Sequence, residues 1–137
     1  MQQVFSYEGT RKFDVEFMER VYKQKFEVVA CKYDEVPASV EASIPAGGHL
    51  EGNRIGFDAG GSDRKVSAVV NGEVIHSEEV VWFPKTNEDP EYHYQGILDS
   101  FKRAASKMPR VDAIGVSSAG VYVDNEVRAA SLFIKVP

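Results

Sequence analysis

The stretch of sequence best suited to chemistry is a glycine-rich turn between two apolar runs. It reads GFDAGGSDRK over residues 56–65, with Asp58 at the end of the first run and Gly60, Gly61 and Ser62 just after it. Because glycines carry no side chain, several backbone N–H groups of such a turn can approach one anion, such as a phosphate. A carboxylate beside them offers the oxygen ligand that Mg²⁺ prefers. The pattern indicates either a phosphate site with Asp58 near the metal or an ordinary glycine-rich hairpin.

Other residues that could act in catalysis or metal binding lack suitable partners in the sequence. Ser117 and Ser118 end an apolar run before Gly120, a position that can expose a hydroxyl to a substrate. Neither hydroxyl has a His/Asp pair at a suitable spacing, so the sequence does not indicate an activated nucleophile. None of the three histidines has a partner at the spacing of a metal site.

The elements around the glycine turn are predicted from local signals. Residues 54–58 and 65–70 are rich in β-branched and apolar side chains and predict two strands flanking the turn. Asn71-Gly72 follows, and both residues tolerate the positive φ of a tight hairpin turn. Residues 73–83 are therefore expected to run back antiparallel as a third strand.

A helix and a further strand are expected next. Asp89-Pro90-Glu91 combines an N-cap residue, a proline suited to the first turn and an acidic side chain that complements the helix dipole. Pro109 ends the helix after Met108. Residues 111–120 then form a short apolar run, which is typical of a buried strand joining a parallel sheet. The apolar stripe of the helix consists of Tyr94, Ile97, Leu98, Phe101, Ala105 and Met108.

The ends of the chain are expected to be less regular. Residues 13–26 predict a short helix with Phe13, Phe17 and Val21 on one face, and residues 26–33 predict a strand. Proline, glycine and few large apolar residues mark a linker at residues 36–53. After residue 120 we expect a hairpin with Asp124-Asn125 at its tip, and an uncovered strand edge at the terminal SLFIKVP, residues 131–137.

Composition limits the function classes. The formal charge is −5, from 16 basic and 21 acidic residues, which gives no general attraction to nucleic acid or to an anionic membrane. The sequence has no apolar stretch near the roughly 20 residues of a membrane span and no signal-peptide core at its start, so we expect a cytoplasmic protein. Cys31 is the only cysteine and is expected to be a small buried side chain; the chain cannot form an internal disulfide or a cysteine-based zinc site.

Two segments in a fixed order resemble a known family. Residues 56–74, GFDAGGSDRKVSAVVNGEV, resemble the first phosphate motif of the actin, Hsp70 and sugar-kinase superfamily, and most closely that of the ROK family of repressors and sugar kinases. The family pattern is a strand, Asp, any residue, Gly-Gly-Thr, a lysine and a second strand; Ser62 replaces the threonine and keeps its hydroxyl. Residues 113–127, AIGVSSAGVYVDNEV, are similar to the family's strand, Ser-x-Pro-Gly and short hairpin, with Ala119 at the proline position. The resemblance covers about residues 53–137.

The resemblance implies a nucleotide site with Mg²⁺ served by Asp58. It also implies that Ser118 and Gly120 lie near the substrate. Asp63 and Arg64 lengthen the turn relative to the family pattern, which leaves open whether Lys65 or Arg64 faces the phosphates. The residues implied to bind the cofactor are Asp58, Gly60, Gly61, Ser62 and Lys65.

The implied activity belongs to a longer parent protein. In the family, the catalytic Gly-Asn-Asp segment, the cysteine-rich zinc motif and the adenosine motif lie further along the chain than the matched segment. We therefore assign no catalytic residue to this chain and expect it to be inactive alone, whereas the full-length parent transfers a phosphoryl group from ATP, with Mg²⁺, to a sugar hydroxyl. The alternative is a non-catalytic, ligand-sensing regulator or interaction module. The N-terminal stretch lacks the winged helix of ROK repressors, which favours a kinase-like parent.

The fold class expected from these observations is α/β. We expect a ribonuclease-H-like mixed sheet in the order β-β-β-α-β, forming part of the N-terminal lobe of an actin-like ATPase at residues 53–137, after an extension at residues 1–52. The expected partners are a nucleotide and, in the parent, a sugar, with no nucleic acid and no membrane. Uncovered apolar surface and the terminal strand edge predict a homo-oligomer.

Overall fold

The computed structural model describes residues 1–40 and 47–137. The linker expected at residues 36–53 falls partly on residues 41–46, which lie outside the described residues. The elements in chain order are α1 (Lys12–Tyr22), the 3-10 turn η1 (Tyr33–Glu35), β1 (Asn53–Ala59), β2 (Asp63–Val70), β3 (Glu73–Val81), α2 (Pro90–Ala105), β4 (Ala113–Ser118), β5 (Gly120–Val123) and β6 (Glu126–Ala130).

The chain divides into two compact units. The larger unit comprises Gly47–Gly120 and Ala130–Pro137 and contains the glycine turn. The smaller unit comprises Met1–Ala46 and Val121–Ala129. Each unit is described by itself below.

Four strands of the larger unit form a mixed sheet in the order β3-β2-β1-β4. β2 pairs antiparallel with β1 and with β3, and β4 pairs parallel with β1. The predicted α/β order of three antiparallel strands, a crossover helix and a parallel fourth strand is therefore confirmed. Asn71 (φ 49°) and Gly72 (φ 87°) form the turn between β2 and β3 with the positive φ values predicted for it. The Asn71 side chain also accepts a hydrogen bond of 2.8 Å from the amide of Gly52, which ties this turn to the start of β1.

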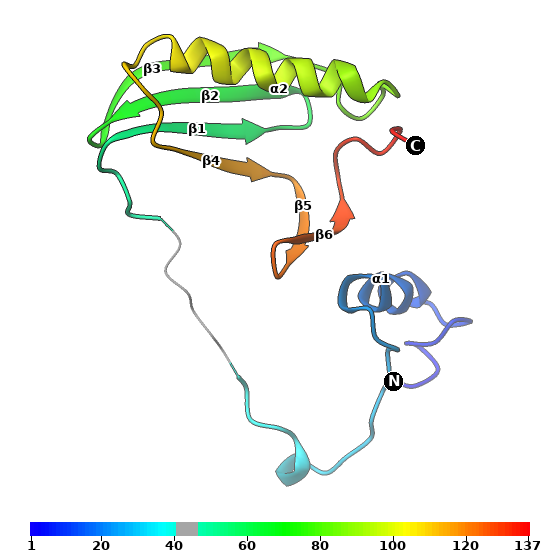
Figure 1. Ribbon diagram of the computed structural model, residues 1–137. Helices are drawn as coiled ribbons and strands as arrows, with labels where there is room; N and C mark the ends of the chain where they lie inside the picture. Colours follow the sequence, from blue (N-terminus) through cyan, green and yellow to red (C-terminus); the bar gives the residue numbers. More distant parts are fainter. Residues whose placement is uncertain (41–46) are drawn as a thin grey trace. The chain divides into compact units, whose positions relative to one another are not determined.

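Helix α2 begins where the sequence predicts. Asp89 is the N-cap, and its Oδ1 accepts a hydrogen bond of 3.0 Å from the amide of Glu91, while Pro90 occupies the first turn. The helix lies along one face of the sheet, where it contacts β1 and β2 (Figure 1). It ends at Ala105 rather than at Met108, although Met108 still packs into the core.

The buried face of α2 is rotated slightly from the expected stripe. Tyr94 is 58% exposed, whereas His93, Ser100 and Ala104 are buried. His93 is accommodated because its Nε2 lies 3.1 Å from the carbonyl oxygen of Asn87. The members of the expected stripe that pack against the core are Ile97, Phe101, Ala105 and Met108.

The core forms between α2 and alternate residues of β1 and β2. The rings of Phe57 and Phe101 meet edge to face, with centroids 5.2 Å apart. Because successive strand residues point to opposite faces, Asp58 and Lys65 lie on the face of the sheet away from α2. The strand residues buried on the helix side are Ile55, Phe57 and Ala59 of β1 and Val66 and Ala68 of β2.

β4 is an edge strand, so the prediction of a buried strand at residues 111–120 is wrong in this respect. Ile114 and Val116 are 45% and 62% exposed. Their register with Ile55 and Phe57 places them on the helix side of the sheet, but the main contacts of α2 are with β2 and β1. The apolar run predicted the strand correctly, whereas its burial depended on a covering element.

The terminal residues 131–137 do not form the uncovered strand edge predicted for them. Leu132 is 1% exposed and belongs to the core of the larger unit. The ring of Phe133 lies against Trp82, with centroids 5.9 Å apart, and its amide donates a hydrogen bond of 3.0 Å to the carbonyl of Pro84. This segment fills the core instead of offering a strand for pairing.

The smaller unit contains α1 and the β5–β6 hairpin. Asp124 (φ 52°) and Asn125 (φ 61°) form the hairpin tip, as predicted. Lys23, which ends α1 with a φ of 53°, places its Nζ 3.0 Å from Oε2 of Glu126 on β6. Within this unit the helix and the hairpin are thus joined by an ion pair.

Three expectations for the smaller unit are wrong: the strand at residues 26–33, the burial of Cys31 and the place of Phe13 on the buried face of α1. Residues 26–33 form no strand, and Val29 within them is 74% exposed; Cys31 is exposed rather than buried. A segment of strand-forming residues needs a partner strand for its backbone hydrogen bonds, and none of the described strands pairs with residues 26–33. Phe13 is 71% exposed, because the buried face of α1 is formed by Val15 and Val21.

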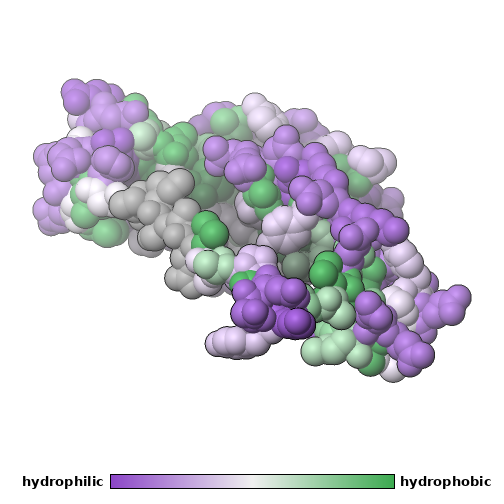
Figure 2. All heavy atoms as spheres, turned by 90° about the horizontal axis from the view of Figure 1, so that it is seen from below, coloured by the Kyte–Doolittle hydropathy of each residue, from purple (hydrophilic) through white to green (hydrophobic). Residues whose placement is uncertain are grey.

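The described residues include no helix with the length and apolar character needed to cross a membrane. Figure 2 shows hydrophilic side chains over most of the face that it displays, with apolar side chains exposed in smaller groups between them. The displayed face is therefore largely polar, and its exposed apolar residues are scattered in small groups.

Candidate functional site

A row of polar side chains crosses all four strands of the sheet on the face away from α2. Asp58 on β1 is in register with Ser117 on β4 and with Lys65 on β2, and Lys65 is in register with Glu79 on β3. The row lies at the carboxyl ends of β1 and β4, next to the glycine turn. One residue from each of the four strands is thus brought to the same end of the sheet.

Asp58 is held by a neighbour on the parallel strand. Ser117 Oγ donates a hydrogen bond of 2.6 Å to Asp58 Oδ1. The carboxylate is half-buried, and its second oxygen, Oδ2, has no hydrogen-bond partner among the described residues. One oxygen is therefore oriented by the protein, and the other is available to a ligand.

The glycine turn presents unused hydrogen-bond donors. No backbone carbonyl of the described residues accepts a hydrogen bond from the amides of Gly60, Gly61 or Ser62. Two carbonyls of the turn, in contrast, are engaged by Trp82, whose amide donates to Ser62 O at 3.1 Å and whose Nε1 donates to Gly60 O at 2.8 Å. A turn with fixed carbonyls and free amides favours an anion over a cation.

The backbone at Gly60 leaves no room for a side chain. A Cβ on Gly60 would lie 2.5 Å from the carbonyl oxygen of Asp63, closer than real Cβ contacts. A Cβ on Gly61 would meet only the flexible end of Lys85, whose Nζ would be 2.9 Å away. Gly60 is therefore required by the geometry of the turn, and Gly61 lies beneath Lys85, which no motif of the sequence indicates.

The charges around the turn are partly paired. Lys65 Nζ lies 2.8 Å from Asp63 Oδ1 and 3.9 Å from Glu79 Oε2. The hydrogen bond from Lys65, followed by that from Ser62, lowers the pKa of Asp63, and the bond to Asp63 is the main reason that the pKa of Lys65 is raised. Both side chains are consequently charged at neutral pH.

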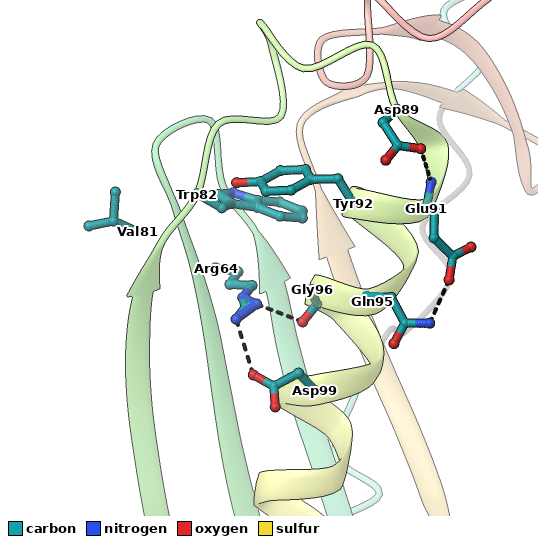
Figure 3. Close-up of a pocket in the computed structure, with 9 residues that line it drawn as sticks. All are labelled: Arg64, Val81, Trp82, Asp89, Glu91, Tyr92, Gln95, Gly96 and Asp99. Atoms are coloured by element: carbon teal, nitrogen blue, oxygen red, sulfur yellow. Dashed lines mark hydrogen bonds and ion pairs between the residues drawn. The ribbon is translucent and has the colours of Figure 1, made fainter.

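Arg64 lies on the opposite side of the sheet from this row. Its guanidinium donates to the carbonyl of Gly96 at 2.6 Å and to Oδ2 of Asp99 at 3.3 Å, both on α2 (Figure 3). Arg64 is 8% exposed. Of the two basic residues left open by the sequence, the structure thus places Lys65 on the face of Asp58 and Arg64 beneath α2.

A pocket of about 540 Å³ lies beside Arg64, between α2 and the neighbouring ends of β2 and β3 (Figure 3). It is on the helix side of the sheet, so it does not contain the Asp58 row. Its lining residues are Arg64, Val81, Trp82, Asp89, Glu91, Tyr92, Gln95, Gly96 and Asp99.

Of the two residues implied to lie near a substrate, Ser118 lies on the side of the sheet away from Asp58. Ser118 is in register with Ala59, whose side chain is buried on the helix side, so Ser118 lies on the face opposite Asp58. Gly120 begins β5 with a φ of 145°, which favours glycine. The serine next to Asp58 is Ser117, and only the register of β4 on β1 distinguishes the two.

The donor set fits a metal ion that arrives with its own phosphate ligands. The described residues contain no group of three or more His, Cys, Asp or Glu side chains arranged to hold a metal. Mg²⁺ commonly keeps several waters and uses one or two protein carboxylates together with substrate phosphates. Asp58 with a free Oδ2, beside unpaired amides, meets this requirement, and a cage built from protein ligands alone does not form here.

Comparison of the sequence with protein-family models and with curated proteins gives no match to either. The functional assignment therefore depends on the two sequence motifs and on the geometry around Asp58.

Proposed function

We propose that the end of the sheet formed by Asp58, the glycine turn and Ser117 binds the phosphates of a nucleotide and faces the accompanying Mg²⁺. In this proposal the larger unit has ribonuclease-H-like topology and is part of the N-terminal lobe of a ROK-type sugar kinase. The strand order, with β1 antiparallel to β2 and parallel to β4, supports the proposal.

The observation that carries the proposal is the meeting of Asp58 and Ser117 beside free turn amides. In open α/β sheets, ligands bind outside the carboxyl ends of parallel strands, at the point where strand connections diverge. β1 is such a point, because one neighbour follows by a tight turn and the other by a crossover helix. A ligand at this edge meets amide donors and a carboxylate together.

Each residue has a separate task in this proposal. The amides of Gly60, Gly61 and Ser62 donate to phosphate oxygens, and Asp58 Oδ2 accepts from a metal-bound water or binds the metal directly. Ser117 orients the Asp58 carboxylate through Oδ1. When bound, Mg²⁺ supplies charge neutralisation for phosphoryl transfer to a sugar hydroxyl.

This chain binds and positions in the proposed reaction, and we assign it no catalytic base. It should show no turnover in a coupled kinase assay over a panel of hexoses and amino sugars with ATP. Turnover that survives repurification and disappears in Asp58→Asn would contradict this assignment. A non-catalytic module of the same fold would keep the same phosphate contacts, and phosphorylation by the full-length parent distinguishes it from a kinase.

The single tryptophan gives a direct test of binding. Trp82 is 2% exposed, and its Nε1 is bonded to Gly60 O, so its fluorescence responds to movement of the turn. Titration with MgADP or MgATP should change the emission at millimolar concentration, whereas adenosine should not. Asp58→Asn should abolish the Mg²⁺-dependent part of the change. Asp124→Asn, at the tip of the β5–β6 hairpin, is the matched control and should titrate like the wild-type protein. Equal responses to adenosine and MgADP, or no response to either nucleotide, would contradict the proposal.

A further inference from the structure

Lys85, in the loop between β3 and α2, lies directly over the glycine turn. A Cβ on Gly61 would be 2.9 Å from Lys85 Nζ and 3.0 Å from Lys85 Cε. Lys85 is exposed, and among the described residues it forms no ion pair. An unpaired ammonium group therefore lies next to amides that have no protein acceptor.

The two other basic residues near the turn are already engaged. Arg64 is buried beneath α2, where Gly96 and Asp99 receive its guanidinium hydrogen bonds (Figure 3). Lys65 is paired with Asp63 at 2.8 Å and lies 3.9 Å from Glu79, so two carboxylates offset its charge. Neither side chain presents an uncompensated positive charge to the turn.

The residues just before Lys85 anchor its loop, Trp82 to the glycine turn and Pro84 to the C-terminal segment. Pro84 is fully buried, and its carbonyl accepts the hydrogen bond of 3.0 Å from the Phe133 amide. Two residues earlier, Trp82 bonds to both Gly60 and Ser62. The backbone around Lys85 is thus fixed relative to the glycine turn, and only its flexible side chain has to adjust to a ligand.

We propose that Lys85 is the cation that pairs with the terminal phosphate at the glycine turn, in place of the Lys65 and Arg64 considered from the sequence. The inference rests on the proposed nucleotide site and identifies the side chain that supplies its positive charge. A lysine ammonium is a compact charge with three donors, which suits phosphate oxygens that lack a fixed orientation. The ligand class is a nucleoside di- or triphosphate. Inorganic pyrophosphate carries the same terminal phosphate groups.

Calorimetric titration of the full chain with MgADP and with magnesium pyrophosphate tests the assignment. Lys85→Ala should weaken binding of both ligands about ten-fold, as expected for loss of a charge-assisted hydrogen bond. Its affinity should also fall less steeply with added salt than that of the wild-type protein. Lys102→Ala, on the exposed side of α2, is the matched control and should change neither quantity. Lys85→Arg should restore most of the affinity, which a merely structural role for the side chain would not predict.

The outcomes separate this inference from the function on which it rests. Because Lys85 is exposed, thermal unfolding of Lys85→Ala should match that of the wild-type protein within about 0.5 kcal/mol. If the wild-type protein binds MgADP and Lys85→Ala binds equally well, while Lys65→Ala loses about ten-fold, Lys85 is excluded and the nucleotide site stands. If the wild-type protein binds neither ligand, both proposals fail.

Discussion

Ser117 Oγ donates a hydrogen bond of 2.6 Å to Asp58 Oδ1, joining residues 59 positions apart in the sequence across the parallel strands β1 and β4. The bond fixes the direction of a carboxylate that has one oxygen left for a ligand. Through this bond β4, the strand that follows the crossover helix, contributes to the glycine-turn site. The site is therefore a property of the folded sheet and not of the turn alone.

Removal of the Ser117 hydroxyl should weaken binding of MgADP without abolishing it. Ser117→Ala frees Asp58 Oδ1, and loss of one hydrogen bond corresponds to about a five-fold lower affinity. Ser118→Ala is the matched control, since its side chain lies on the other face, and should bind like the wild-type protein. Isothermal titration calorimetry compares the two; a larger loss in Ser118→Ala would mean that the wrong hydroxyl has been placed at the site.

The two glycines of the turn should respond differently to alanine. In Gly60→Ala the new Cβ meets the backbone of Asp63, so we expect destabilisation of about 1–3 kcal/mol, as in overpacked sites. In Gly61→Ala the side chain of Lys85 can move away, so the free energy of unfolding should change by about 0.5 kcal/mol or less. Urea denaturation measures both. Equal effects at the two positions would show that the turn relaxes around either side chain.

Asp112 should make the larger unit sensitive to acid. Arg110 beside it, then the Asn53 amide, lowers the pKa of Asp112 below its ordinary value of 3.8. A lowered folded-state pKa contributes stability that is fully present above the unfolded value and is lost as pH falls through the folded value. The difference in unfolding free energy between the wild-type protein and Asp112→Asn should therefore be constant near neutral pH and shrink below about pH 4. A difference that stays constant down to about pH 2 would contradict this sign.

The exposed edge at β4 should mediate self-association. β4, AIGVSS, has no charged residue and exposes Val116, whereas β3 at the other edge carries glutamates that disfavour pairing. We expect a homodimer or higher oligomer in light scattering at micromolar concentration, and Val116→Lys should shift it to monomer. Val74→Lys on β3, where the native side chain is 60% exposed, is the control and should leave the oligomer intact. A strictly monomeric wild-type chain would exclude this surface.

The parts of the fold that the sequence predicts correctly are those with local causes. Asn71-Gly72 determines a turn through its own φ values, and Asp89-Pro90 begins a helix through its own cap and ring. These signals do not depend on a distant partner. Together with the apolar runs of the strands, they predict the order of the elements from β1 to β4.

The parts that the sequence does not predict depend on distant partners. Two apolar runs look alike in the sequence, residues 26–33 and 131–137. The first is largely exposed and pairs with no strand, whereas the second places Leu132 in the core. The choice between Ser117 and Ser118 depends on a one-residue register, since each shift moves a side chain to the other face. Lys85 reaches Gly61 only because Trp82 and Pro84 anchor its loop, and no spacing in the sequence indicates that contact.

Amide mapping by heteronuclear NMR tests the central claim most directly, by locating a bound nucleotide on the chain. Titration of the ¹⁵N-labelled protein with MgADP should shift the backbone amides of Gly60, Gly61 and Ser62 first and most, and Asp58→Asn should remove the Mg²⁺ dependence of those shifts. Shifts confined to the pocket beside Arg64, around Tyr92 and Gln95, or the absence of shifts at the turn while MgADP is bound, would contradict the assignment of the glycine turn as the phosphate site.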